Sequence, residues 1–288
     1  MVNTMNTGVY PEEWATALQE RLNKPTNWKE ACQVIYSNTK IFNFPYMATE
    51  FSTQTGTRGS SYSFSDFTLT NDTVDIATIE LEPVFIDRAD LAQCTLNTVV
   101  DIATRQGDHM SEEIEAGWLA DHGSWTNFDA GTLATGTAST VAITVSANNI
   151  DDIIRKVKTK IGEANGQSLA DRDGIFIVWR YKDLEELEKF AQANGFTLAD
   201  KALKNGIKTG YHFMGVDHYV SNSHTDNHLC GGVKKVCQIG ILKSTWGKVT
   251  QTVDPNMQSG VGVVSRADYG LNVKAAHGAI VFDIICNA

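Results

Sequence analysis

The stretch RADLAQCTLNTVVDIATRQGDHMSEEIEAGWLADH, residues 88–122, carries the strongest local pattern in the chain. Its apolar and small residues recur at intervals of three and four, which is the spacing of one face of an α-helix. The members of this stripe are Ala92, Leu96, Val99, Ala103, Gly107, Met110, Ile114 and Trp118. The pattern predicts one helix over residues 88–122, about 50 Å long and far longer than the average globular helix of about 11 to 12 residues. We expect Gly107 to permit a close backbone approach or to mark a bend.

The segment before this helix, residues 48–86, is typical of extended chain. Phe51 to Thr70 is rich in Ser, Thr and Gly with alternating aromatic residues, and Thr73 to Phe85 alternates β-branched and aliphatic residues. Gly56 and Gly59 mark a flexible tip. The pattern predicts a long β-hairpin with few residues able to form a core of its own. Because an isolated two-stranded hairpin is marginally stable in water, we expect it to need a partner surface, for example on another subunit.

The opening of the chain predicts short helices. Residues 10–22 place Pro11 in a first helical turn and repeat apolar residues every four positions. The apolar stretch Ala31 to Tyr36 is interpreted as a second short helix. These segments are too small to build a core alone, so we expect them to form an arm that packs on something else.

After residue 122, helices and strands interleave. A Gly-, Ala- and Thr-rich stretch, residues 123–147, indicates a domain boundary, and residues 149–162 repeat apolar side chains at helical spacing. A buried strand over Gly174 to Trp179 and a helix closed by Gly195 follow. The remaining chain predicts strands at Tyr211–Ser221, Lys235–Leu242, Gly260–Ser265, Tyr269–Lys274 and His277–Ile285. The order predicts an α+β fold without a regular βαβ repeat.

Composition limits the functions that the chain can have. The 288 residues are 42% hydrophobic and 20% charged, and the net charge of −10 disfavours direct binding to nucleic acid phosphates. No apolar run approaches the roughly 20 residues of a membrane span. Residues 1–10 lack the basic and apolar blocks of a signal peptide, which predicts a protein made and used in a cytoplasm. We expect most of the five scattered cysteines to be buried free thiols; they are Cys32, Cys94, Cys230, Cys237 and Cys286.

One cluster has metal-like spacing. His224 and His228 stand four apart, which is a zinc spacing, and Cys230 and Cys237 follow. Two cysteines of a zinc site are usually separated by two to four residues, and here the interval is wider. We therefore favour an ordinary surface loop with two histidines and one partly buried thiol. The four residues are kept as a weak metal candidate, and no catalytic residue and no cofactor is assigned.

Other ionisable residues also carry no site. His212 and His218 are expected on one face of a strand with Asp217 on the opposite face, so they are interpreted as ordinary strand histidines. Three glutamates on the long helix are expected beside the buried stripe and in solvent; they are Glu112, Glu113 and Glu115. Phosphate-binding and nucleophile-elbow motifs are absent from the sequence.

The order of these segments resembles that of a known family. Five local stretches carry the resemblance: VFIDRADLAQ (84–93), NIDDIIRKVKTKI (149–161), RDGIFIVWRYKDLEELEKF (172–190), NGIKTGYHFMGVDHYVSN (205–222) and ADYGLNVKAAHGAIVFDI (267–284). They are similar to the major capsid proteins of tailed bacteriophages, of the Hong Kong phage type. This family has an N-terminal arm, an extended β-hairpin loop, a long spine helix, an axial domain and peripheral strands.

The resemblance implies both a domain layout and a function. The implied segments are an arm (1–47), an extended loop (48–86), a peripheral domain with the spine helix (87–147), an axial domain (148–243) and closing peripheral strands (244–288). The implied function is a structural virion protein, without catalysis, that forms pentamers and hexamers of an icosahedral head around double-stranded DNA. Assembly in the bacterial cytoplasm, with no membrane, is implied too.

The resemblance also bears on partners and crosslinks. Many relatives carry a cleaved scaffolding segment before the arm, whereas here Met1 is followed almost at once by the arm helix. We therefore expect a separate scaffolding protein, or an assembly that needs little help, together with portal and decoration proteins. The loop residues 50–81 contain no lysine, so an isopeptide crosslink donated from this loop is not expected.

Two alternatives stay open. An encapsulin-like nanocompartment shell protein shares the fold and an acidic, cytoplasmic chain. A small zinc-dependent enzyme would use His224, His228 and Cys230. Shell-forming protein would exclude the enzyme, and neighbouring genes would separate a phage from a nanocompartment.

Overall fold

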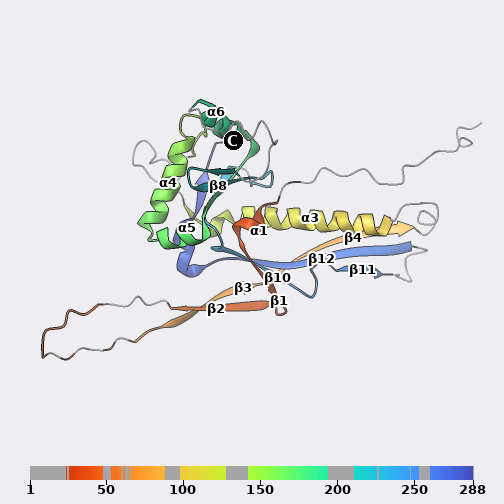
Figure 1. Cartoon of the computed structure of the whole chain (residues 1–288). Coiled ribbons are helices and arrows are strands. Elements are labelled where there is room, and N and C mark those ends of the chain that lie inside the picture. Colours follow the sequence, from red (N-terminus) through yellow and green to blue (C-terminus); the bar gives the residue numbers. More distant parts are fainter. Residues whose placement is uncertain are drawn as a thin grey trace, which may run out of the picture.

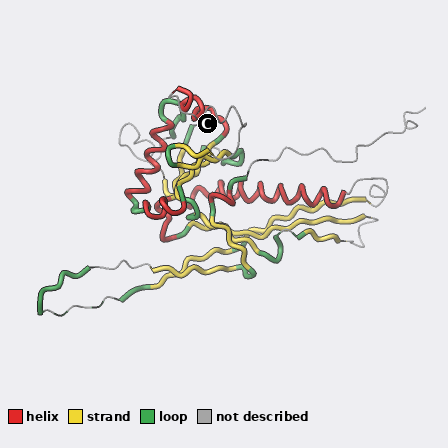
Figure 2. Tube along the Cα trace, in the orientation of Figure 1, coloured by secondary structure: helices red, strands yellow, loops and turns green. Residues whose placement is uncertain are grey.

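The computed structural model describes residues 24, 26–47, 53–59, 61, 64, 66–87, 98–127, 142–193, 211–225, 227–246, 248–252 and 260–287. Its shape is elongated. A compact part holds helices around one sheet, and from it a long helix and another sheet extend in one direction (Figure 1). A two-stranded hairpin projects in the other direction, well clear of the rest (Figure 2).

Helices and strands are interleaved along the described chain without a regular βαβ repeat, as the sequence predicts. The helices are α1 (Trp28–Ala31), α3 (Thr98–Ala120), α4 (Ile150–Glu163), α5 (Gln167–Asp173) and α6 (Tyr181–Ala193), with 3-10 helices η2 (Asp121–Ser124) and η4 (Ala275–Ile280). The strands up to the compact part are β1 (Gln33–Ser37), β2 (Ile41–Met47), β3 (Leu69–Asp75), β4 (Thr78–Asp87) and β5 (Thr126–Asn127). The later strands are β6 (Ile175–Trp179), β7 (Tyr211–Phe213), β8 (Val216–Val220), β9 (His228–Val233), β10 (Cys237–Leu242), β11 (Val249–Thr252), β12 (Gly260–Val273) and β13 (Val281–Ile285). The fold is α+β.

One sheet lies along the long helix α3, which we call the spine helix. Its strand order is β1-β10-β12-β11, and β4 pairs with β12 along the whole of β4. The 14-residue strand β12 thus pairs with β10 and β11, which lie shortly before it in sequence, and with the distant strand β4. The side chain of Gln106 fixes the spine helix to this sheet, since it donates to Glu82 O (2.7 Å) and accepts from the Ser265 hydroxyl (2.6 Å).

The second sheet, with the order β5-β13-β9-β6-β8-β7, forms the centre of the compact part. Strand β6 is buried along its whole length, as its continuous apolar run predicts. Helix α4 packs an apolar face against this sheet, and its buried residues are Ile150, Ile153, Ile154, Val157 and Ile161. The predictions of a helix over 149–162 and a buried strand over 174–179 are confirmed.

The spine helix is confirmed where the structure describes it. Met110, Ile114 and Trp118 of the predicted stripe are buried, and the 23 residues give a length of about 34 Å. The first part of the predicted helix, residues 88–97, lies outside the described residues, and so do the arm helix over 10–22 and Gly195.

Two local predictions are wrong. Residues 31–36 do not form a helix, because the chain leaves α1 after Ala31 and enters β1, which pairs in parallel with β10. The predicted hairpin is also displaced along the chain. Strand β3 pairs with β2, whereas β4 turns away after Asp75 and pairs with β12. The alternating residues 73–85 thus belong to two strands with different partners. The spacing of apolar residues alone does not show where one strand ends and the next begins.

The four described cysteines are free and buried, as expected; they are Cys32, Cys230, Cys237 and Cys286. Within the described residues, no helix has the length and apolar character that crossing a membrane requires.

Candidate functional site

The hairpin of residues 41–75 carries large apolar side chains that are exposed to solvent. The side chains of β2 alternate between exposed and half-buried, and Met47 pairs with Leu69 at the far end of the ladder. Its exposed large apolar residues are Ile41, Met47, Phe64, Phe67 and Leu69. Such a surface marks a site of contact with another molecule.

The base of the hairpin is fixed to the body by close packing. Val74 and Ile76 are buried. Val74 packs so closely on Gly240 that a Cβ atom added to this glycine would lie only 2.7 Å from Val74 Cγ1. The Asp72 carboxylate accepts from Asn272 Nδ2 (2.9 Å) and from the backbone of Ala275 (3.0 Å). The hairpin is therefore fixed to the body at its base, and its far end, where Met47 pairs with Leu69, projects away from the body (Figure 1).

Strand β4 adds a second exposed apolar surface. Among the described residues its one partner strand is β12, so β4 is an edge strand. Its exposed residues Ile79, Leu81 and Phe85 fall at alternate positions and thus on one face. Pro83 suits an edge strand because proline has no N–H to donate. An exposed apolar edge is a template for contact with another chain.

Two glutamates of the spine helix bind the backbone of Lys24, Asn27 and Trp28. Glu115 is fully buried, and its Oε2 accepts from the backbone N–H groups of Trp28 (2.8 Å) and Asn27 (3.1 Å). Glu112 Oε1 accepts from the backbone of Lys24 (2.7 Å). The prediction that these glutamates lie in solvent is wrong for Glu112 and Glu115. They accept hydrogen bonds from backbone N–H groups that lie about 90 positions earlier in the chain. The helical spacing of apolar residues does not reveal such a distant partner.

Burial raises the pKa of Glu115 to about 7, and the hydrogen bonds from Asn27 and Trp28 oppose this shift. The ordinary value is 4.5, so between pH 4.5 and pH 7 the unfolded chain loses this proton while the folded chain keeps it. The contribution of Glu115 to stability is therefore complete below pH 4.5 and declines as pH rises toward 7.

We expect the difference in unfolding free energy between the native chain and Glu115→Gln to fall by about 3 kcal/mol from pH 4.5 to pH 7. The difference is the relevant quantity, because His218 and His224 have pKa values lowered by burial to about 4 and act in the opposite direction. Urea unfolding at a series of pH values measures it. A difference that is constant with pH would contradict the assignment.

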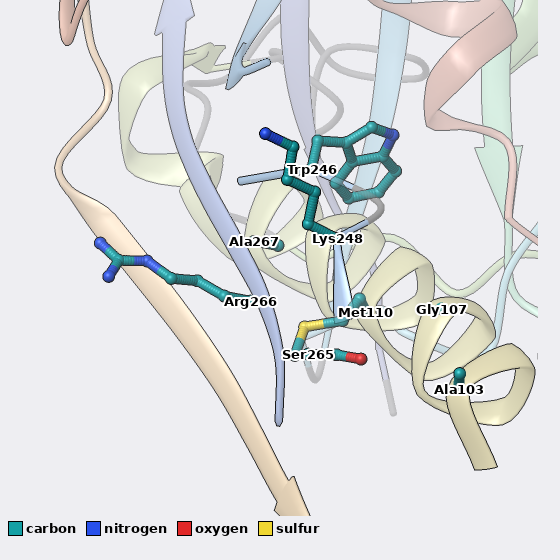
Figure 3. Close-up of a pocket in the computed structure, with 8 residues that line it drawn as sticks. All are labelled: Ala103, Gly107, Met110, Trp246, Lys248, Ser265, Arg266 and Ala267. Atoms are coloured by element: carbon teal, nitrogen blue, oxygen red, sulfur yellow. The ribbon is translucent and has the colours of Figure 1, made fainter. Parts of the chain in front are cut away.

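A small pocket lies between the spine helix and the sheet (Figure 3). Its lining residues are Ala103, Gly107, Met110, Trp246, Lys248, Ser265, Arg266 and Ala267. Gly107 leaves this side open, because a Cβ atom there would meet no atom within 4 Å. Ten residues along the same helix, a Cβ atom at Gly117 would lie 2.6 Å from the hydroxyl oxygen of Tyr269.

These two glycines give a matched pair of substitutions. Gly107→Ala should raise the unfolding free energy by about 1 kcal/mol, because alanine is the better helix former and the space is open. Gly117→Ala should lower it despite the same gain in helix propensity, because the ring of Tyr269 must move. Thermal unfolding of the two variants measures both effects, and stabilisation by Gly117→Ala would contradict this packing.

The predicted metal candidate is not assembled as the sequence suggests. His224, His228, Cys230 and Cys237 do not form one of the groups of close ligand atoms found among the described residues. His224 Nδ1 contacts His228 O (3.1 Å), and the two thiols are buried. His228 instead lies beside Asp283, with His228 Nδ1 at 2.9 Å from Asp283 Oδ1, and stacks on His122. The sequence signal for Asp283 was a lone carboxylate within an apolar strand.

The strand predicted over residues 211–221 is a hairpin. Met214 and Gly215, both with positive φ, reverse the chain between β7 and β8. His212 therefore pairs with Asp217 (2.7 Å), whereas His218 is buried and accepts from Trp179 Nε1 (2.9 Å). The expectation of structural histidines agrees with these contacts, but the two do not share one continuous strand.

No protein-family model matches the chain, and no curated protein matches it by sequence. Solved structures match it over nearly its whole length. The capsid of an empty GTA particle matches with a TM-score of 0.72 and 14% identity, over 98% of this chain and 97% of that chain. A structure from Mycobacterium phage Che8 matches with a TM-score of 0.67 and 15% identity, over 97% and 98%.

The capsid structure of cyanophage P-SCSP1u matches with a TM-score of 0.62 and 14% identity, over 100% of this chain and 97% of that chain. At such identities the likeness is one of fold. It extends over almost the whole of both chains in each match. The chain therefore has the Hong-Kong-phage-type capsid fold that the order of its segments predicted.

Proposed function

We propose that the chain is the major capsid protein of a tailed bacteriophage, a structural subunit without catalysis. It forms pentamers and hexamers of an icosahedral head that encloses double-stranded DNA. One observation carries the proposal: the hairpin of residues 41–75 projects from the body and exposes large apolar side chains. A shell subunit covers such an element by laying it across a neighbouring copy.

Charge and surface chemistry support the same proposal. The net charge of −10 suits a container wall that meets DNA without specific contact. Because like charges approach one another when subunits associate, shell formation should be favoured by added salt. The exposed face of β4 offers a second contact between copies.

The proposal extends to partners, location and domains. The subunit would act in the virion after assembly in the host bacterial cytoplasm, with a separate scaffolding protein, a portal and decoration proteins. The proposed domains are 1–47, 48–86, 87–147, 148–243 and 244–288, as the resemblance implies. Strand pairing crosses the last of these limits twice, because β10 pairs with β12 and β13 pairs with β9.

Negative-stain electron microscopy of the recombinant protein, with size-exclusion chromatography, tests the proposal. Closed shells, tubes or capsomer rings are the expected result. A discrete monomer or dimer, with or without a crowding agent or the scaffold, would overturn it. Shells would leave a nanocompartment as the other possibility, and portal and terminase genes beside this gene would decide for the phage.

A further inference from the structure

Three metal-ligating side chains meet where the spine helix reaches the six-stranded sheet. His122 belongs to η2, His228 begins β9, and Asp283 lies in β13. One ligand atom from each lies within 4.8 Å of the others, and within the described chain no other group of three or more such side chains is this close. We propose that His122, His228 and Asp283 bind one divalent transition-metal ion, for which Zn²⁺ is the probe.

Sheet register explains two of the three positions. Asp283 lies directly opposite Cys230 in the β13–β9 ladder. His228 stands two residues before Cys230, so it projects from the same face and is a diagonal neighbour of Asp283. The third residue, His122, is positioned by η2, which directly follows the end of the spine helix. The backbone N–H of Trp125 donates to His122 O (3.1 Å) and closes this turn. Separate elements thus place the three side chains together.

The buried carboxylate is a reason for a cation at this place. The side chain of Asp283 is only 5% exposed, and among the described residues its ion pairs are with His228 (2.9 Å) and His122 (3.8 Å). A carboxylate withdrawn from water is costly unless it is paired with positive charge. Imidazole coordinates a metal in its neutral form, so a bound ion would supply the charge that neutral histidines do not.

The donor set suits zinc and its neighbours in the first transition row. Two imidazole nitrogens and one carboxylate oxygen, with water at a fourth position, form the open type of zinc site. Ligands at about 2.0 to 2.2 Å from a tetrahedral ion are about 3.3 to 3.6 Å apart. The observed separations from Asp283 Oδ2 are 3.0 Å to His228 Nδ1 and 3.8 Å to His122 Nδ1, which bracket this distance.

Binding requires one ring to turn. The two imidazoles are stacked at 3.6 Å between centroids and 10° between planes, so their nitrogen lone pairs lie in nearly parallel planes and do not converge on one point between the rings. The ring of His122 must rotate to direct its nitrogen at the shared ion. Its side chain is 29% exposed and belongs to a short 3-10 helix, which gives it room to turn and gives the ion access from solvent.

This site differs from the one that sequence spacing suggested. It shares His228, but Cys230 and Cys237 are not part of the group. It also goes beyond the proposed capsid function, because it depends on contacts within one subunit.

Metal analysis of the purified chain without a polyhistidine tag, after dialysis against Zn²⁺, tests the proposal. We expect one Zn²⁺ per chain, and Co²⁺ in its place should give the visible absorption of a four-coordinate site. Loss of an outer-shell partner costs about 10- to 100-fold in metal affinity, so His122→Gln and His228→Gln should each weaken binding at least tenfold. His212→Gln is the matched control, because His212 also pairs with a carboxylate, that of Asp217, but belongs to no group of three metal-ligating side chains among the described residues.

The outcomes separate clearly. Absence of stoichiometric Zn²⁺, or equal loss of binding in His212→Gln, would overturn the proposal, and so would unchanged binding in both site variants. Circular dichroism shows whether each variant is folded. If His228→Gln fails to fold, the partly exposed His122→Gln decides alone.

Discussion

Replacing Phe67 and Leu69 together by serine should abolish shell formation and leave the isolated subunit folded. These side chains are 60% and 64% exposed in the chain, so the subunit itself loses little. Substitutions on a surface usually change the unfolding free energy by no more than about 0.5 kcal/mol. At a contact between copies, burial of each side chain contributes about 1.5 to 3 kcal/mol. Sedimentation velocity and electron microscopy measure the shell fraction, and thermal unfolding measures the subunit.

The double variant Thr70→Ala with Asn71→Ala is the matched control. Both residues are exposed and polar, and they lie in the same strand as Leu69. We expect this control to assemble like the native chain. Shells from Phe67→Ser with Leu69→Ser at the native yield would mean that the apolar surface of the hairpin does not hold copies together.

Gly270→Ala should destabilise the subunit by at least about 3 kcal/mol. A Cβ atom there would press against the backbone where β3 passes into β4. It would touch the carbonyl oxygen of Asp75 and lie 2.6 Å from its carbonyl carbon and 3.0 Å from Ile76 Cα. Backbone atoms cannot move aside as a flexible side chain can, so the connection between hairpin and body must shift. The urea midpoint measures the loss.

Gly240→Ala is the comparison, because it is crowded by side chains and not by backbone. The nearest atoms to its Cβ would be Val74 Cγ1 at 2.7 Å and Ile76 Cγ1 at 3.3 Å. These can yield by a rotamer change, so we expect a loss of only about 1 to 2 kcal/mol. Equal losses in the two variants would show that the backbone contact at Gly270 is not rigid.

Sequence predicted those parts of the fold that depend on neighbours along the chain. The helix α4 and the strand β6 follow from the spacing of apolar residues and from an unbroken apolar run. The same reasoning failed where the partner is distant. Strand β4 alternates like a hairpin strand, but its partner β12 lies about 180 residues later.

The buried polar residues show the same limit. Nothing in helical spacing distinguishes Glu115, which receives two backbone N–H groups, from Glu113, which lies in solvent beside His109. The spacing of histidines and cysteines drew attention to His228, but it grouped this residue with His224, Cys230 and Cys237. Its neighbours His122 and Asp283 come from two other elements and meet it only when the second sheet is assembled.

The place of β13 in the second sheet has a consequence for synthesis. Strand β13, residues 281–285, lies between β5 and β9 in this sheet. Until β13 has been translated, β5 and β9 each lack it as a neighbouring strand. At about 5 to 20 residues per second, residues 126–127 wait roughly 8 to 30 seconds for their partner. A nascent chain on the ribosome therefore lacks a finished sheet while its hairpin is already made. The subunit can therefore complete its fold only after the hairpin of residues 41–75 has left the ribosome. Folding of the subunit and association of subunits are thus separated in time.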